Sequence, residues 1–167
     1  MTVVVADTSP INYLVLIGQI SILPSLYDEI AIPPEVLAEL KDGNAPPEVL
    51  RWIEAPPEWL RVRQDRTVHD DPALHKIDLG ERAAILLAQQ EPDVLLLIDD
   101  AAGRAEANRR GIPNVGTLGV LRAASIRKLL DLPAALKRLA ETNFRVTESL
   151  LADLLAEDSE RQRRANR

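Results

Sequence analysis

The chain has 167 residues, a length that fits one domain large enough to bury its own core. It has no cysteine, which excludes a disulfide framework and a thiolate zinc site, and its net charge of −6 argues against a general nucleic-acid binder while allowing a local basic rim. No apolar run approaches the roughly 18 residues that span a bilayer, and the N-terminus lacks the basic region of a signal peptide. We therefore expect a soluble, cytoplasmic protein without a membrane segment.

Apolar, β-branched runs predict the strands of a mainly parallel sheet. Residues 2–6 and 94–98 lack the alternation of a half-exposed strand, as expected for strands that helices cover on both faces. Residues 112–115 predict a third short strand, and residues 31–34 a short edge strand that leads into a helix over residues 35–40. Strands that alternate with helices indicate an α/β fold with helices on both sides of the sheet.

The helices are predicted from apolar periodicity and capping residues. The segment DLGE at residues 78–81 has the form of a capping box and begins a helix through AAILLAQQ. Other helices are predicted over residues 11–17, 101–110, 118–130, 133–141 and 147–158. Residues 43–57 are expected to form a loop around a short helical turn, and residues 60–75 a strand remnant and an exposed loop. We expect one domain over residues 1–158 and a basic, frayed tail over residues 159–167.

Acidic residues follow two of the predicted strands. Asp7 ends the first strand, and the pair Asp99 and Asp100 ends the segment LLLIDD. In open parallel sheets the functional crevice lies beyond the carboxyl ends of the strands, so these side chains meet if the two strands are neighbours. The residues alone leave two alternatives open, a helix cap or Asx-turn for Asp7 and a solvated loop for the pair.

Two glutamates can join this acidic set. Glu39 lies on the polar side of the short helix, where a solvent-facing role is the alternative, and Glu81 can instead serve only the capping box. Four or five converging carboxylates repel one another unless a cation joins them. Oxygen ligands without His or Cys suit Mg²⁺ or Mn²⁺, and the typical chemistry of these ions is phosphodiester hydrolysis.

Five segments, in this order, carry a resemblance to a known family: DTSPINYL, PPEVLAEL, LGERAAILLA, LLLIDDAAGR and GIPNVGTLGVL. They resemble the PIN-domain family of metal-dependent ribonucleases, in particular its bacterial and archaeal toxin-like branch. The resemblance covers about the first 125 residues and implies a three-layer α/β/α sandwich with a mainly parallel sheet. By this resemblance the catalytic, metal-binding acids are Asp7, Glu39, Glu81 and one of Asp99 and Asp100. Ser9 matches a small hydroxyl residue that commonly follows the first acid.

The pair at the end of LLLIDD cannot aim at one metal together while it continues a strand, because adjacent side chains of a strand point to opposite faces. The spacing of the last acid in the resembling family places the ligand at Asp100. Asp99 is the less favoured ligand, and is expected either to support the ligands without touching the metal or to cap the next helix. Glu81 stands where many relatives have Asp, and Ile98 where many have Thr. These departures motivate a competing hypothesis, a non-catalytic PIN-like module that binds RNA or protein.

The resemblance and the local charges also suggest partners. Toxin-like relatives imply a single-stranded RNA substrate, a small antitoxin protein and a homodimer. Contacts with RNA phosphates are predicted for three arginines of the helix that follows the acidic pair, with a solvated helix face as the alternative: Arg104, Arg109 and Arg110. Irregular spacing predicts a solvated loop rather than a metal cluster for His69, Asp70, Asp71 and His75.

Overall fold

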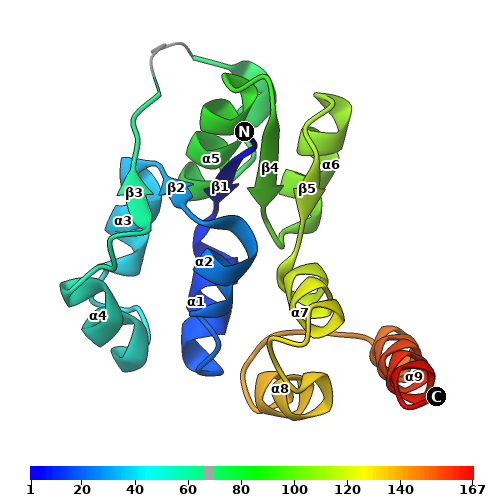
Figure 1. The fold of residues 1–167 in the computed structure, drawn as a ribbon. Coiled ribbons are helices and arrows are strands. Elements are labelled where there is room, and N and C mark those ends of the chain that lie inside the picture. Colours follow the sequence, from blue (N-terminus) through cyan, green and yellow to red (C-terminus); the bar gives the residue numbers. More distant parts are fainter. Residues whose placement is uncertain (66–69) are drawn as a thin grey trace.

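A computed structural model describes residues 1–65 and 70–167 and contains a five-stranded sheet. Its strands are β1 (Val3–Ala6), β2 (Ile30–Ile32), β3 (Leu60–Val62), β4 (Val94–Leu97) and β5 (Asn114–Val115). All neighbours are parallel, in the order β3-β2-β1-β4-β5, with β1 at the centre (Figure 1). The prediction of an edge strand at residues 31–34 was wrong, because both prolines follow β2 and leave its ladder intact.

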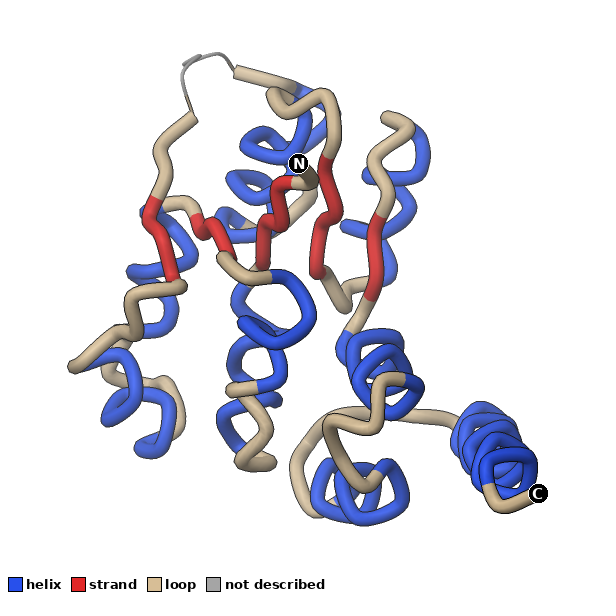
Figure 2. The backbone as a smooth tube through the Cα atoms, in the orientation of Figure 1, coloured by secondary structure: helices blue, strands red, loops and turns tan. Residues whose placement is uncertain are grey.

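Helices connect the strands and cover both faces of the sheet (Figure 1, Figure 2). In chain order they are α1 (Thr8–Leu16), α2 (Ile22–Tyr27), α3 (Pro34–Leu40), α4 (Pro47–Glu54), the 3-10 helix η1 (Pro72–Leu74), α5 (Leu79–Gln89), α6 (Ala101–Arg109), α7 (Thr117–Ile126), α8 (Leu132–Ala140) and α9 (Glu148–Ala165). This arrangement confirms the predicted α/β sandwich. Of the helices that the structure describes, none combines the length and the apolar character needed to cross a bilayer.

Two hydrophobic clusters lie on opposite faces of the sheet. Val4 and Ala6 of β1 belong to the cluster shared with α1, α2, α3, α4 and α7, whereas Val5 belongs to the cluster shared with α5 and α6. Successive side chains of a strand alternate between faces, so a strand covered by helices on both sides has no polar position. The same alternation accounts for the continuous apolar sequence of β4.

The C-terminal helices form a group attached to α7. α7, α8 and α9 contact one another, and α9 is fixed to α7 by a buried hydrogen bond of 2.7 Å from Ser125 to Asp158. α9 continues to Ala165, past the predicted end at Asp158, and so includes most of the residues that were predicted as a tail. Ion pairs between residues three or four apart stabilise this last part of the helix, including those of Glu160 with two arginines.

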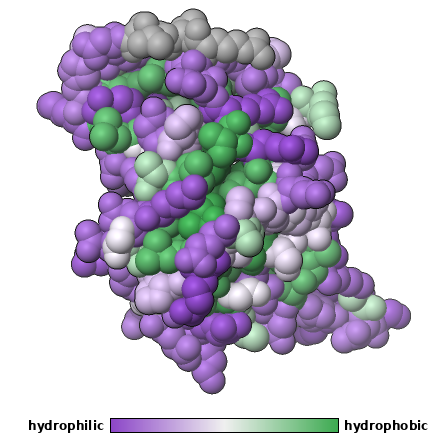
Figure 3. Space-filling view, turned by 90° about the vertical axis from the view of Figure 1, so that its left-hand side faces the viewer, coloured by the Kyte–Doolittle hydropathy of each residue, from purple (hydrophilic) through white to green (hydrophobic). Residues whose placement is uncertain are grey.

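The β3 edge of the sheet is partly open. Val62 at the end of β3 is 49% exposed. Seen from this side, hydrophobic residues gather in a band across the middle of the molecule, with hydrophilic residues on both sides (Figure 3). Exposed strand edges and apolar bands are surfaces on which other chains can pack.

Candidate acidic metal site

The acidic residues gather at the carboxyl edge of the sheet. The N–H of Asp7, directly after β1, donates to the carbonyl of Leu97 at the end of β4 at 2.9 Å, so the two strands are neighbours as the prediction required. A cleft of about 270 Å³ opens at this edge. It is lined by Asp7, Thr8, Ser9, Asn12, Tyr13, Glu39, Asp78 and Glu81. The structure therefore brings together three of the four predicted ligands in one cleft.

Asp7 is a buried carboxylate with an unsatisfied oxygen. Its residue is 3% exposed, and its Oδ1 has no hydrogen-bond partner among the described residues. It occupies the N-cap position of α1 without a side-chain capping bond, so capping does not explain it. Burial, with repulsion from Glu39, Asp78 and Asp99, raises the pKa of Asp7 to about 7, against a backbone hydrogen bond from Thr8 that lowers it.

Glu39 reaches from α3 to the start of α5. Its Oε1 accepts from the N–H of Gly80 at 3.1 Å, and its Oε2 accepts from the hydroxyl of Thr8. A Cβ at position 80 would lie 2.5 Å from both carboxylate oxygens, so a glycine is needed for this contact. Burial, and beyond it the interaction with Asp78, raises the pKa of Glu39 above its ordinary value. The solvent-facing alternative for Glu39 therefore fails.

Glu81 lies in the first turn of α5, but the predicted capping box is only half formed. Asp78 caps the helix by accepting from Gly80 at 3.3 Å, whereas the described residues show no return hydrogen bond in which the N–H of Asp78 donates to the Glu81 carboxylate. Burial and repulsion from Asp7 and Asp100 raise the pKa of Glu81 to about 8. The Glu81 carboxylate is therefore left for the cleft rather than used by the helix end.

Asp99 and Asp100 have different partners. Asp99 accepts from the N–H and the hydroxyl of Thr117 at the start of α7, both at 2.7 Å, and from the hydroxyl of Ser9 at 2.9 Å. Asp100 is the N-cap of α6, where its Oδ2 accepts from Gly103 at 2.9 Å. Of the two alternatives for Asp99, the capping of this helix was wrong, because the chain has already left the strand direction after Ile98 and Asp100 is the cap. Asp99 instead joins α1 to α7.

Glu81 and Asp100 lie near each other across the start of α6. The position of a Cβ on Gly103 is 3.5 Å from Oε2 of Glu81 and 2.7 Å from Cδ1 of Ile98. Gly103 also donates to Asp100, so the helix start, Glu81 and Asp100 share one small region. Ile98 itself is fully buried in the cluster on the α5 and α6 side of the sheet.

The carboxylates fit a hard divalent cation by charge and donor type. Three of them have raised pKa values, and one has an unsatisfied buried oxygen, so the cluster lacks positive charge. All candidate donors are oxygens, as Mg²⁺ and Mn²⁺ prefer. Within residues 1–65 and 70–167, however, no three acidic or histidine side chains converge closely enough to form a coordination shell as they stand.

The comparison with protein families decides the identity of the fold. A family model described as a PIN domain matches residues 3–160. The chain belongs to the PIN-domain family. The match confirms the family predicted from the sequence, extends it past residue 125 into the C-terminal helices, and assigns a nuclease-type fold. No curated protein sequence matches the chain.

The arginines of α6 are divided between the two edges of this PIN domain. Arg104 is exposed near the acids, and its Nη1 is 3.4 Å from the Cβ position of Gly116, which precedes α7. Arg109 and Arg110 lie at the other end of the helix, because α6 runs back along the sheet away from Asp100.

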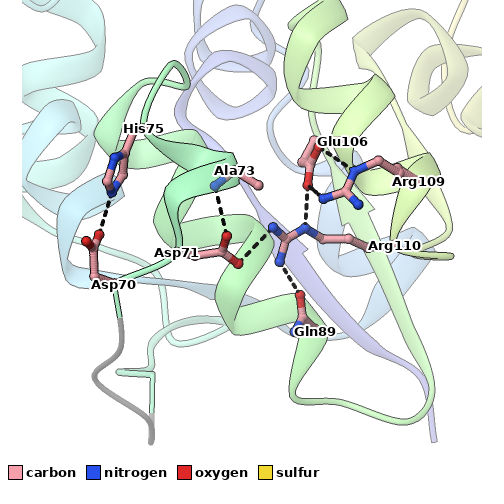
Figure 4. A network of polar contacts seen from close by, with 8 residues as sticks. All are labelled: Asp70, Asp71, Ala73, His75, Gln89, Glu106, Arg109 and Arg110. Atoms are coloured by element: carbon pink, nitrogen blue, oxygen red, sulfur yellow. Dashed lines mark hydrogen bonds and ion pairs between the residues drawn. The ribbon is translucent and has the colours of Figure 1, made fainter.

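Arg110 is held in a polar network at the far end of α6 (Figure 4). It bonds to Asp71 at 2.8 Å, to Glu106 at 2.7 Å and to Gln89 at 2.6 Å, and its side chain is 11% exposed. Arg109 also pairs with Glu106. This network ties the loop before α5 to α6 and leaves Arg110 no free face for a phosphate.

The loop before α5 is more structured than predicted. Asp71 caps η1 in addition to pairing with Arg110, and His75 contacts Asp70 at 2.5 Å. His69 of the same predicted group lies outside the described residues. The solvated-loop prediction therefore fits Asp70 and His75, which are exposed, better than Asp71.

Sequence reasoning missed several residues of the cleft. Asp78 was assigned only to the capping box, although its position three residues before Glu81 places both on one side of the helix. Asn12 and Tyr13 were not singled out, although both lie within the predicted helix, because the sequence alone did not show that these side chains line the cleft beside the acids.

Proposed function

We propose that this PIN domain is a Mg²⁺- or Mn²⁺-dependent endoribonuclease that hydrolyses phosphodiester bonds of single-stranded RNA in the cytoplasm. The observation that carries the proposal is the buried Asp7 carboxylate, with its unsatisfied Oδ1, beside Glu39 and Glu81 in an open polar cleft. Buried acids with raised pKa values that share a cleft are typical of cation sites and catalytic centres.

In this proposal Asp7, Glu39, Glu81 and Asp100 would hold the ion. A bound divalent cation supplies an activated water and stabilises the leaving oxygen. Thr8 and the N–H of Gly80 orient the Glu39 carboxylate, and Gly103 orients Asp100 while leaving its Oδ1 available. Ser9 acts through Asp99, which fixes α1 against α7.

A competing function is a non-catalytic PIN-like module that binds RNA or protein. One observation favours it: in the described part of the chain the acids do not form a three-ligand cluster. Calorimetry with Mn²⁺ separates the two. A stoichiometric site that Asp7→Asn abolishes supports the enzyme, whereas absence of Mn²⁺ binding supports the module.

We further propose that the chain is the toxin of a toxin–antitoxin pair and forms a homodimer. The toxin-like sequence motifs support both statements, and the hydrophobic band on the β3 side offers an area that another chain could cover (Figure 3). Light scattering after size exclusion tests the dimer directly. A monomer at all concentrations would remove this part of the proposal.

The enzyme proposal is tested by cleavage of labelled single-stranded RNA with and without Mg²⁺ or Mn²⁺. Glu39→Gln and Glu81→Gln are expected to abolish cleavage while the protein keeps its fold, because each loses a charged oxygen ligand but keeps its size. Glu58→Gln, an exposed glutamate before β3 at the other edge of the sheet, is the matched control and should cleave normally. Absence of cleavage of any RNA at any metal concentration would refute the enzyme.

The melting temperatures of the same variants test whether Glu81 serves only as a helix cap. Loss of a capping residue costs about 1 kcal/mol and would leave the chemistry untouched. Since Glu81 makes no such bond in the described residues, we expect Glu81→Gln to melt at or above the wild-type temperature in metal-free buffer. Normal activity with a lowered melting temperature would show that the helix cap was its role.

A further inference from the structure

Two residues of the cleft have no part in the proposed metal site. Asn12 and Tyr13 lie in the second turn of α1, and both line the cleft beside the acids. Asn12 is half-buried, and its side-chain amide has no hydrogen-bond partner among the described residues. An amide carries two donors and an acceptor. A partly desolvated amide on a cleft wall therefore has all of this capacity left for a ligand.

Tyr13 is fixed in its orientation by the linker between α8 and α9. Its hydroxyl donates to Oδ1 of Asn143 at 2.7 Å. Its ring packs edge-to-face with Phe144, with ring centroids 4.9 Å apart and ring planes at 81°. Two contacts from a distant segment hold one half-buried ring in place, so the ring presents a preformed surface to the cleft.

Tyr13 also lies close to the acidic edge. Burial, and after it the negative charge of Asp99, raises the pKa of the Tyr13 hydroxyl. The other tyrosine, Tyr27, lines a separate small pocket with Met1 and Thr2 at the opposite edge of the sheet. The chain thus contains one tyrosine beside the acids and one far from them, which provides a matched pair for experiments.

We infer that Asn12 and Tyr13 form a base-binding subsite for a nucleotide next to the scissile phosphate. The inference rests on the proposed function and extends it to how the RNA strand is held. Stacking on aromatic rings is a main source of affinity when proteins bind single-stranded RNA, because every base has a flat face. Tyr13 provides this surface, and the Asn12 amide bonds to the edge of the stacked base. The acids alone would repel the strand.

The test measures binding separately from cleavage. A fluorescein-labelled single-stranded decaribonucleotide is titrated, with Mn²⁺ present, into protein that carries Glu81→Gln, and Kd is read from anisotropy. Tyr13→Leu removes the ring and is expected to raise Kd about 10-fold, which corresponds to about 1.4 kcal/mol. Asn12→Ala is expected to raise Kd severalfold. Tyr13→Phe keeps the ring and should change Kd less than Tyr13→Leu, and Tyr27→Leu should leave it unchanged.

In the protein with Glu81 intact, the same substitutions should raise KM by similar factors and leave kcat within about twofold, because a subsite that binds substrate and transition state alike affects KM. If Tyr13→Leu does not fold, Asn12→Ala still tests the subsite. Its own substitution breaks no hydrogen bond, because the Asn12 side chain has no partner among the described residues.

The outcomes distinguish the subsite from the enzyme. If RNA is not cleaved but Asn12→Ala and Tyr13→Leu weaken binding, the proposed nuclease fails and the subsite stands. If RNA is cleaved and neither substitution changes Kd or KM, the subsite is wrong and the nuclease stands. Equal losses for Tyr13→Phe and Tyr13→Leu, equal losses for Tyr27→Leu, or absence of any binding also overturn the subsite.

Discussion

Asp99 and Asp100 show how two adjacent carboxylates acquire different roles. Both oxygens of Asp99 are occupied, by the N–H and hydroxyl of Thr117 and by the hydroxyl of Ser9. Asp100 uses only Oδ2, for Gly103, and its other oxygen has no hydrogen bond within the described residues. A carboxylate whose acceptors are already used is a poorer metal ligand than one with a free oxygen, so Asp100 is the ligand we expect.

Asp100→Asn is predicted to abolish metal-dependent cleavage without loss of stability. Asn is as good an N-cap as Asp, so α6 keeps its cap and only the charged ligand is lost. Asp99→Asn should instead lower the free energy of unfolding by about 1–2 kcal/mol and keep most of the activity, because it disturbs the contacts between α1 and α7. RNA cleavage and urea unfolding of both variants check this. Loss of activity in Asp99→Asn alone would reverse the assignment.

The raised pKa of Asp7 predicts how the metal-free protein responds to pH. The folded protein holds this proton up to about pH 7, whereas the ordinary value for the group is 3.8. The stability that the proton provides is therefore complete below about pH 4 and is lost as the pH rises through 7. Asp7→Asn is neutral at every pH and lacks this loss. The difference has an upper limit of about 4 kcal/mol.

Melting temperatures in EDTA at pH 5 and pH 8 measure this effect. We expect Asp7→Asn to melt higher than the wild type at pH 8, with a smaller advantage at pH 5. Mn²⁺ should then raise the wild-type melting temperature at pH 8 and leave that of Asp7→Asn nearly unchanged, because a ligand stabilises only the state that binds it. An Asp7→Asn protein less stable than the wild type at pH 8 would show that the carboxylate is satisfied in the folded state.

At the scale of elements, the start of α5 depends on a glycine that makes room for another helix's side chain. Gly80→Ala would place a Cβ 2.5 Å from both oxygens of Glu39 and so move this carboxylate out of the cleft. Because the clash involves the end of a flexible side chain and Ala favours helix, stability should change by less than about 1 kcal/mol. Activity should fall at least tenfold, as read from cleavage rates. Gly43→Ala, with open space around it, is the control and should match the wild type.

Several elements could be predicted from the sequence because a single local sequence pattern, such as an apolar run or a capping residue, determined each of them. The apolar runs of β1 and β4 predicted the sheet, and the Asp78 cap predicted the start of α5. The acids that follow the strands predicted the functional edge of the sheet and most of the cleft. Elements fixed by tertiary contacts were predicted only in part. α4 runs over Pro47–Glu54, where a loop around a short helical turn was expected, and α9 persists beyond Asp158, the residue that binds Ser125 on α7. The side chains from the linker after α8 that fix Tyr13 carry no local signal at all.

At the scale of the whole molecule, the net charge of −6 and the acidic cleft both oppose RNA, so binding must rely on a few well-placed cations and on contacts with bases. α6 carries cations at both of its ends. Arg104 stands at the acidic edge, bonded through Nε to Asn114 and without an ion pair in the described part of the chain. Arg110 stands at the opposite edge and is neutralised by Asp71 and Glu106.

The different surroundings of Arg104 and Arg110 predict that substitution of the first affects RNA binding and substitution of the second affects stability. Arg104→Ala should weaken binding of single-stranded RNA severalfold at low salt and reduce the slope of log K against log salt by about 0.7, the value for one lost phosphate contact. Arg110→Met should leave affinity and slope unchanged but lower the free energy of unfolding by about 2 kcal/mol, since Asp71 and Glu106 lose a partly buried partner. Anisotropy titrations at several salt concentrations and urea unfolding measure the two effects. If Arg110→Met lowers the salt slope and Arg104→Ala does not, the RNA strand approaches the opposite edge of the sheet, and the acidic cleft is not where it binds.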